Sequence, residues 1–131
     1  MEKTMPSQTI CAIPKVTMDH EGIFKFVQIR GPDGQTHLFG TAKYMTHKLQ
    51  FESGFLAQVA KVDFPPDFNV RVQIEGFACM GGGIIKIDSS KKTVTVSDYS
   101  RIYGPYNPAT VKALLEEYVK EKLPGFSVEI S

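Results

Sequence analysis

Strand-like segments recur along most of this chain, and only two stretches have helical periodicity. The strand-like segments are residues 23–30, 36–39, 70–79, 84–87, 93–96 and 126–130. Gly31-Pro32-Asp33-Gly34 is a strong turn signal between the first two segments, so they are expected to form a β-hairpin. The order of strands, helix, strands, helix and strand predicts an α/β (α+β) domain, with a mixed β-sheet of about six strands and two packed helices.

The first helical pattern covers residues 45–62, and residues 63–67 end it with two prolines. Thr46 is a plausible N-cap, which places His47 in the first turn, and Gly54 interrupts the pattern. Its apolar face is predicted to consist of Met45, Leu49, Phe55, Leu56, Val59 and Val62.

The second helical pattern begins with Asn107 as the cap and Pro108 at the first helical position. Leu123-Pro124-Gly125 ends it. Its apolar face is predicted to consist of Val111, Leu114, Leu115, Tyr118 and Val119.

Length and composition bound the class of protein. The 131 residues suit one domain spanning 1–131, with 1–12 as a loose lead-in. The chain has 15 Lys and Arg against 14 Asp and Glu, and this net charge of +1 disfavours a nucleic-acid binder. No apolar run approaches the roughly 20 residues of a membrane-spanning helix. We expect a cytoplasmic monomer that binds neither nucleic acid nor membrane.

The histidines and cysteines show no spacing typical of metal ligands. His20, His37, His47, Cys11 and Cys79 form no CxxC, HxxxH or similar pattern. We therefore expect no metal and no cofactor.

Three consecutive glycines, Gly81-Gly82-Gly83, break the chain between two strand-like segments. They are not a Walker loop, because Ile84-Ile85 and a strand follow them instead of Lys-Ser/Thr and a helix. A bend or bulge is the simpler interpretation. The alternative is a close approach of the backbone to a ligand or to a neighbouring loop.

Lys25 shares a strand face with apolar residues, because Ile23, Val27 and Ile29 have the same parity. One interpretation is an edge strand whose ammonium group reaches water. The other is a cation held at a cleft to meet an anion.

His47 differs from the other two histidines by its predicted place at a helix start. The positive end of a helix dipole disfavours imidazolium and attracts anions. A neutral imidazole beside a bound phosphate could act as a general base or as a nucleophile. A surface histidine without function is the alternative. His20 and His37 are both predicted to be surface residues.

The loop 99–105 follows a strand and precedes a helix. Such loops expose backbone amides, and Ser100 adds a hydroxyl donor. A tight turn that Gly104-Pro105 makes rigid is the structural alternative, and both interpretations can hold together.

Three separated motifs resemble the Janus/ocnus family. Residues 19–30 (DHEGIFKFVQIR) resemble the opening D-x-x-G-V-F-K-Y-V-L-I of that family. Residues 79–83 (CMGGG) stand at its C-L-G-G-G position, and residues 99–105 (YSRIYGP) at its Y-S-x-x-Y/F-G loop. Their order and spacing agree from about Ala12 to Ile130.

This resemblance implies a mixed sheet with two helices and a metal-independent protein-histidine phosphatase activity. Carried over residue by residue, it implies that His47 is the catalytic histidine and Lys25 the substrate-binding lysine. Ser100, Arg101 and Ile102 stand at the phosphate-binding loop. The expected partners are proteins or peptides that contain phosphohistidine.

The chain departs from the family pattern at three positions. No acidic residue follows His47 in the sequence THKLQF, and Ile84 and Phe39 replace two arginines. Each missing cation would weaken an anion pocket by about 1 kcal/mol or more if it contacts phosphate. The leading hypothesis is a phosphohistidine phosphatase, and the alternative is a noncatalytic module that binds phospho-ligands.

Overall fold

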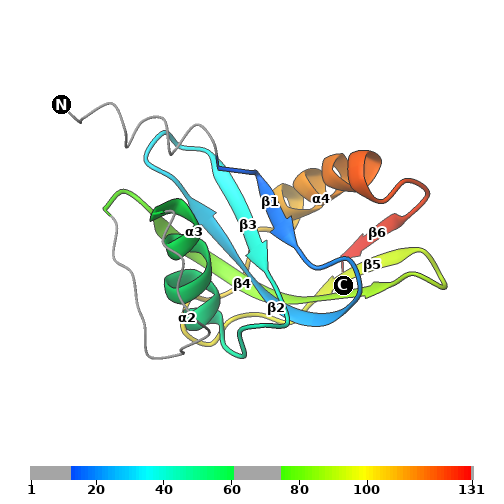
Figure 1. Ribbon diagram of the computed structural model, residues 1–131, viewed down its shortest axis with the longest axis horizontal. Helices are drawn as coiled ribbons and strands as arrows, with labels where there is room; N and C mark the ends of the chain where they lie inside the picture. Colours follow the sequence, from blue (N-terminus) through cyan, green and yellow to red (C-terminus); the bar gives the residue numbers. More distant parts are fainter. Residues whose placement is uncertain (1–12, 61–74, 131) are drawn as a thin grey trace.

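The computed structural model describes residues 13–60 and 75–130, which form a six-stranded mixed sheet with two helical segments (Figure 1). The strands are β1 (Val16–Met18), β2 (Gly22–Arg30), β3 (Thr36–Gly40), β4 (Ala78–Asp88), β5 (Thr93–Ser97) and β6 (Ser127–Ile130). Their order across the sheet is β1-β3-β2-β4-β5-β6. The β1–β3 and β5–β6 pairs are parallel, and the other pairs are antiparallel. The predicted α+β fold and the β2–β3 hairpin are confirmed.

The first helical segment runs from His47 to Ala60. It consists of α2 (His47–Leu49), a π-helical turn (Gln50–Phe55) and α3 (Leu56–Ala60). Thr46 caps it as predicted, because its Oγ1 accepts a hydrogen bond from the Leu49 N–H at 3.1 Å. Gly54, which interrupts the apolar pattern in the sequence, lies buried inside the π-helical turn.

The predicted apolar face of this helix is only partly right. Phe55, Leu56 and Val59 are buried, but Met45 precedes the helix and is 71% exposed. A π-helical turn holds one residue more than an α-turn, so the face defined by the first turn does not continue into the last. Val62 lies outside the described residues.

The second helix, α4 (Pro108–Lys122), begins and ends as predicted. The Asn107 side chain accepts from the Thr110 N–H, and Pro108 is the first helical residue. Val111, Leu115 and Val119 form its buried stripe. Within the described residues, no helix is both long and apolar enough to cross a membrane.

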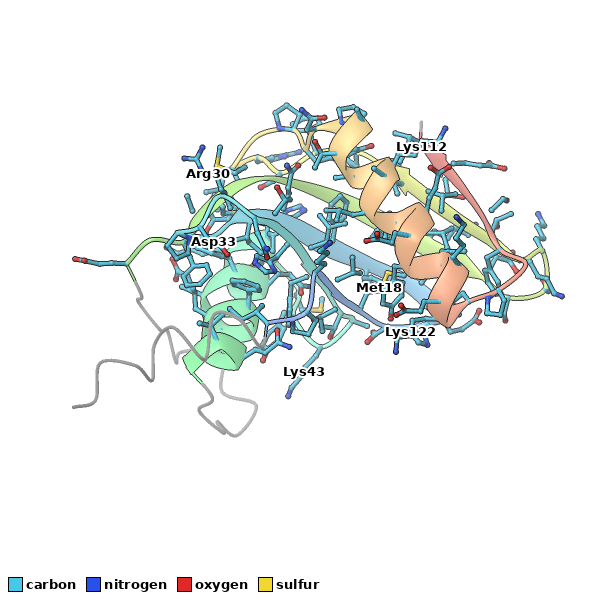
Figure 2. All side chains as sticks on the ribbon, turned by 90° about the horizontal axis from the view of Figure 1, so that it is seen from above. Met18, Arg30, Asp33, Lys43, Lys112 and Lys122 are labelled. Atoms are coloured by element: carbon cyan, nitrogen blue, oxygen red, sulfur yellow. The ribbon has the colours of Figure 1, made fainter. Side chains whose placement is uncertain are left out.

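The two faces of the sheet carry separate hydrophobic cores. Phe24 and Phe26 on β2 point to one face, where they pack in the core that α4 covers, and we call it the α4 face. Val27 and Ile29 point to the other, which the helix His47–Ala60 covers, and we call it the α2–α3 face. Figure 2, seen from above, shows α4 lying over the sheet with Met18 of the same core nearby.

The helix covers only part of the α2–α3 face. Along β2, Val27 and Ile29 are fully buried, Lys25 is half-buried, and Ile23 is 63% exposed. Lys25 thus lies where helical cover ends. The edge-strand interpretation of Lys25 is wrong, because β2 is an interior strand between β3 and β4.

Strand β4 passes through the three glycines without a break, contrary to the prediction. Its register against β2 shifts at one point, where Gln28 pairs with Gly81 but Ile29 pairs with Cys79. Met80 is the extra residue, so the predicted bulge is confirmed beside the glycines. Of the predicted strand 70–79, residues 70–74 lie outside the described residues, and 75–76 form a turn before β4 begins.

Two features were not predicted from the sequence. β1 is a three-residue strand that pairs with β3, and it is too short to show an alternating pattern. His37 was expected at the surface but is 1% exposed. Its Nδ1 donates to the Pro14 carbonyl at 2.9 Å, and its ring lies 5.6 Å from that of Phe55. The backbone acceptor satisfies one ring nitrogen, whereas Nε2 is buried and forms no hydrogen bond among the described residues.

The absence of a side chain at Gly54 permits close packing between the helix and Phe39 of β3. A β-carbon at Gly54 would lie 2.5 Å from Phe39 Cε1 and 3.0 Å from Tyr44 Cε2. Overpacking costs about 1–3 kcal/mol, whereas helix propensity favours alanine by about 1 kcal/mol. We expect Gly54→Ala to lower the free energy of unfolding by about 1 kcal/mol net in urea denaturation, because Phe39 is buried among other rings and cannot move away without cost.

Ala113→Gly on the exposed side of α4 is the matched control for helix propensity. It should lower the free energy of unfolding by about 1 kcal/mol. A Gly54→Ala protein more stable than the wild type would contradict the packing argument.

Candidate functional site

The residues singled out from the sequence line one pocket. It has a volume of about 590 Å³ and lies where helical cover of the α2–α3 face ends. Its lining residues are Lys25, Thr46, His47, Ile84, Asp98, Tyr99, Ser100, Arg101 and Ile102. Four stretches of the chain therefore converge here: β2, the start of α2, β4 and the loop after β5.

His47 is held in place from two directions. The Gln50 side chain, fully buried, donates to the carbonyls of Thr41 and Tyr44 at 2.6 and 2.9 Å and accepts from the Thr41 N–H at 3.2 Å. These bonds tie the connection after β3 to the helix. On the other side, a β-carbon at Gly82 would lie 2.7 Å from the Cδ2 of His47. The missing side chain of Gly82 is therefore what lets the imidazole lie against β4.

The hydrogen bond of the His47 ring sets its tautomer. Nε2 lies 2.9 Å from the carbonyl oxygen of Gly83, and a carbonyl can only accept. Nε2 therefore carries the proton, and in the neutral ring Nδ1 carries the free lone pair. Among the described residues, no protein atom forms a hydrogen bond with Nδ1. The ring is 8% exposed, and it lines the pocket.

The surroundings lower the pKa of His47 below that of a free imidazole. Burial is the largest cause, because it penalises the charged form, and the positive charge of Lys25 acts in the same direction. The hydrogen bond to Gly83 and the negative charge of Asp98 oppose this shift. The neutral form of the imidazole therefore predominates at pH 7.

The loop after β5 folds back on itself and on β4. The Gly104 carbonyl accepts from the N–H groups of Gly82 and Ser100 at 3.1 and 3.2 Å, and the Gly104 N–H donates to the Ser100 carbonyl at 2.8 Å. The Gly104 φ of 87° lies in the left-handed region that glycine tolerates. The sequence offered a rigid turn and a close approach of the glycines to a neighbouring loop as alternatives, and the structure has both.

These hydrogen bonds determine which backbone N–H groups of the loop can still donate to a ligand. The Ser100 N–H is already bonded, and the Ser100 Oγ accepts from the Tyr103 N–H at 3.0 Å. In the part of the chain that the structure describes, the N–H groups of Arg101 and Ile102 have no protein acceptor. A ligand at the pocket could therefore use the amides of Arg101 and Ile102 and the O–H of Ser100.

The charges of the pocket are mixed. Lys25 and Arg101 supply positive charge, and Asp98 adds a carboxylate that sequence reasoning missed. Asp98 has a φ of 66°, which is rare for a residue other than glycine. Its place after a strand end and before the Tyr-Ser motif was the only sequence signal. Ile84 lines the pocket, whereas Phe39 lies in the core of the α2–α3 face.

Metal ligands and reactive thiols do not gather in this region. Over residues 13–60 and 75–130, no three His, Cys, Asp or Glu side chains are grouped to hold a metal ion. Burial raises the pKa of the Cys79 thiol to about 12, so this cysteine is protonated and a poor nucleophile at neutral pH.

Comparisons with known proteins agree with the motifs. The model of the Janus/Ocnus family matches residues 10–122. The sex-regulated protein janus-A of Drosophila mauritiana is 29% identical, over 97% of this chain and 85% of the relative. The janus-A protein of Drosophila melanogaster is 30% identical over the same shares. The human 14 kDa phosphohistidine phosphatase is 28% identical over 91% of this chain and 90% of the relative. This chain belongs to the Janus/Ocnus family.

Proposed function

We propose that this chain is a protein-histidine phosphatase that hydrolyses phosphohistidine in proteins or peptides. The observation that carries the proposal is a neutral imidazole with a free Nδ1 in the same pocket as Lys25 and the free amides of Arg101 and Ile102. A family relative named a phosphohistidine phosphatase supports it.

In this proposal, some residues of the pocket bind the phosphoryl group and His47 carries out the chemistry. Lys25 is a cation on a rigid interior strand, and it forms a charge-assisted hydrogen bond with one phosphoryl oxygen. The N–H groups of Arg101 and Ile102 and the O–H of Ser100 bind the other oxygens as neutral donors. This arrangement fixes the phosphorus atom in front of His47.

His47 acts through Nδ1 in one of two ways. As a general base it takes a proton from the water whose oxygen attacks phosphorus. As a nucleophile it forms a transient Nδ1–P bond that water then hydrolyses. In both routes the P–N bond of the substrate breaks and its imidazole leaves with the electron pair and takes up a proton. The carbonyl of Gly83 keeps the proton of the catalytic ring on Nε2.

Removing the His47 ring tests the proposal directly. We expect His47→Ala to lower kcat on a phosphohistidine peptide by about 100-fold or more, because the proton acceptor or nucleophile is lost. Release of inorganic phosphate measures the rate, and circular dichroism verifies the fold. His20→Ala is the matched control, since His20 is exposed and bonds to Tyr118 outside the pocket. Full activity of His47→Ala would refute the assignment.

The lowered pKa of His47 predicts the acid limb of the pH profile. A base works when it is neutral, so kcat/KM should stay high below about pH 6.5 and fall only as the pH passes the lowered pKa. Asp98→Asn removes a charge that raises this pKa, so the acid limb should move to still lower pH. Asn also tolerates a positive φ.

Asp33→Asn is the charge-matched control for this profile. Asp33, which is labelled in Figure 2, is an exposed residue in the turn between β2 and β3. It does not line the pocket. Its acid limb should coincide with that of the wild type. A wild-type limb above about pH 6.5 would exclude His47 as the titrating base.

A noncatalytic module that binds phospho-ligands is the second candidate. Ile84 in the pocket wall favours it, because the arginine of the family pattern, whose charge would stabilise the phosphoryl group during transfer, is absent at this position. Calorimetric titration with a phosphohistidine peptide analogue, paired with the turnover assay, separates the two. Binding without turnover supports the module, and turnover that depends on His47 supports the enzyme.

A further inference from the structure

Exposed large apolar side chains gather around the pocket. In the described part of the chain they are Ile23 (63% exposed), Met45 (71%), Met80 (44%), Tyr99 (57%) and Ile102 (66%). Tyr99 and Ile102 line the pocket itself. Ile23 and Met45 line a second pocket. Only Met80 borders neither pocket. Apolar groups concentrated around one site indicate an interaction surface.

The second pocket, which we call the apolar subsite, adjoins the first. Its volume is about 230 Å³, and Lys25 and Ile84 line both pockets. The other lining residues are Ile23, Phe24, Ala42, Tyr44 and Met45. The Tyr44 hydroxyl donates to the Ser53 carbonyl at 3.1 Å, so it is already satisfied. Among the residues that line the apolar subsite, Lys25 is the one with a charged side chain.

We propose that the apolar subsite binds an apolar side chain of a polypeptide substrate, close in sequence to its phosphorylated residue. This inference rests on the function proposed for the adjoining pocket and names its substrate class. Because Lys25 and Ile84 line both pockets, a chain whose phosphoryl group contacts Lys25 has its neighbouring residues within reach of the subsite. A free phosphoramidate would leave the exposed Ile23 and Met45 in water.

Strand geometry narrows the position of that apolar residue. In an extended peptide, side chains alternate between faces, so residues two positions apart point the same way. The phosphorylated side chain and the apolar side chain must both point to this surface. For a peptide bound in an extended conformation, an apolar residue two positions from the phosphorylated residue meets this condition.

Binding of stable peptide analogues tests the proposal without depending on turnover. The probes are peptides with a phosphonotriazole analogue of phosphohistidine and either Leu or Ser two positions before or after it. Isothermal titration calorimetry should give a Kd about tenfold lower for Leu than for Ser at one of these positions, as burial of part of a leucine side chain predicts. Ile23→Ser and Met45→Ser should abolish this difference.

Met80→Ser is the matched control, because Met80 is an exposed methionine that lines neither pocket. It should keep the full preference for Leu. Equal Kd values for the Leu and Ser peptides in the wild type would overturn the proposal. So would a wild-type dimer that Met45→Ser converts to a monomer in sedimentation, together with equal Kd values, because the occupant would then be a second copy of the chain.

Turnover of the phosphohistidine peptide with Ser at both flanking positions, which places no leucine in the subsite, reports on the first pocket. If the Leu preference is absent while this turnover is normal and depends on His47, the apolar subsite is refuted and the phosphatase stands. If this turnover is absent while the Leu preference persists, the phosphatase fails and the subsite belongs to a binding module.

Discussion

The close packing of side chains against β4 at Gly82 and Gly83 is the constraint on which the site depends. Successive residues of a strand face opposite sides, so Gly82 makes room on the α2–α3 face and Gly83 on the α4 face. The His47 ring lies over Gly82, and the Tyr106 ring lies over Gly83 and 5.4 Å from Phe26. A side chain at either glycine would push away one of these rings. The glycines thus bring the start of one helix and the loop before the other onto a single strand.

This packing also sets the electrostatics of the imidazole. A ring lying on backbone is removed from water, and this burial lowers its pKa, while the carbonyl of Gly83 directs its proton to Nε2. The same helix start that buries the ring leaves the next part of the sheet face uncovered. Lys25 lies at that boundary, where a cation can meet a ligand and still reach solvent. The burial of the imidazole and the partial exposure of Lys25 therefore have one common origin.

Asp98 and Ile84 distinguish this pocket from one built only to attract a dianion. The carboxylate counteracts part of the attraction from Lys25 and Arg101, and Ile84 gives the wall an apolar surface. That apolar surface continues into the second pocket beside Ile23 and Met45. On the function proposed above, this composition would let apolar contacts with the polypeptide supply binding energy that the charges on the phosphoryl group alone do not.

The sequence by itself determined the elements that local patterns encode: the β2–β3 hairpin, the capped start of α4, the Thr46 cap that places His47 first in its helix, and the alternation of β5. It also identified residues that line one pocket, because the order and spacing of motifs can be compared with a family without knowing the geometry. It could not find β1, the burial of His37, the π-helical turn or the role of Asp98. Each of these depends on a partner distant in sequence or on a backbone angle. Only the tertiary structure decided that β4 continues through its glycines, because the segments that pack against them come from elsewhere in the chain.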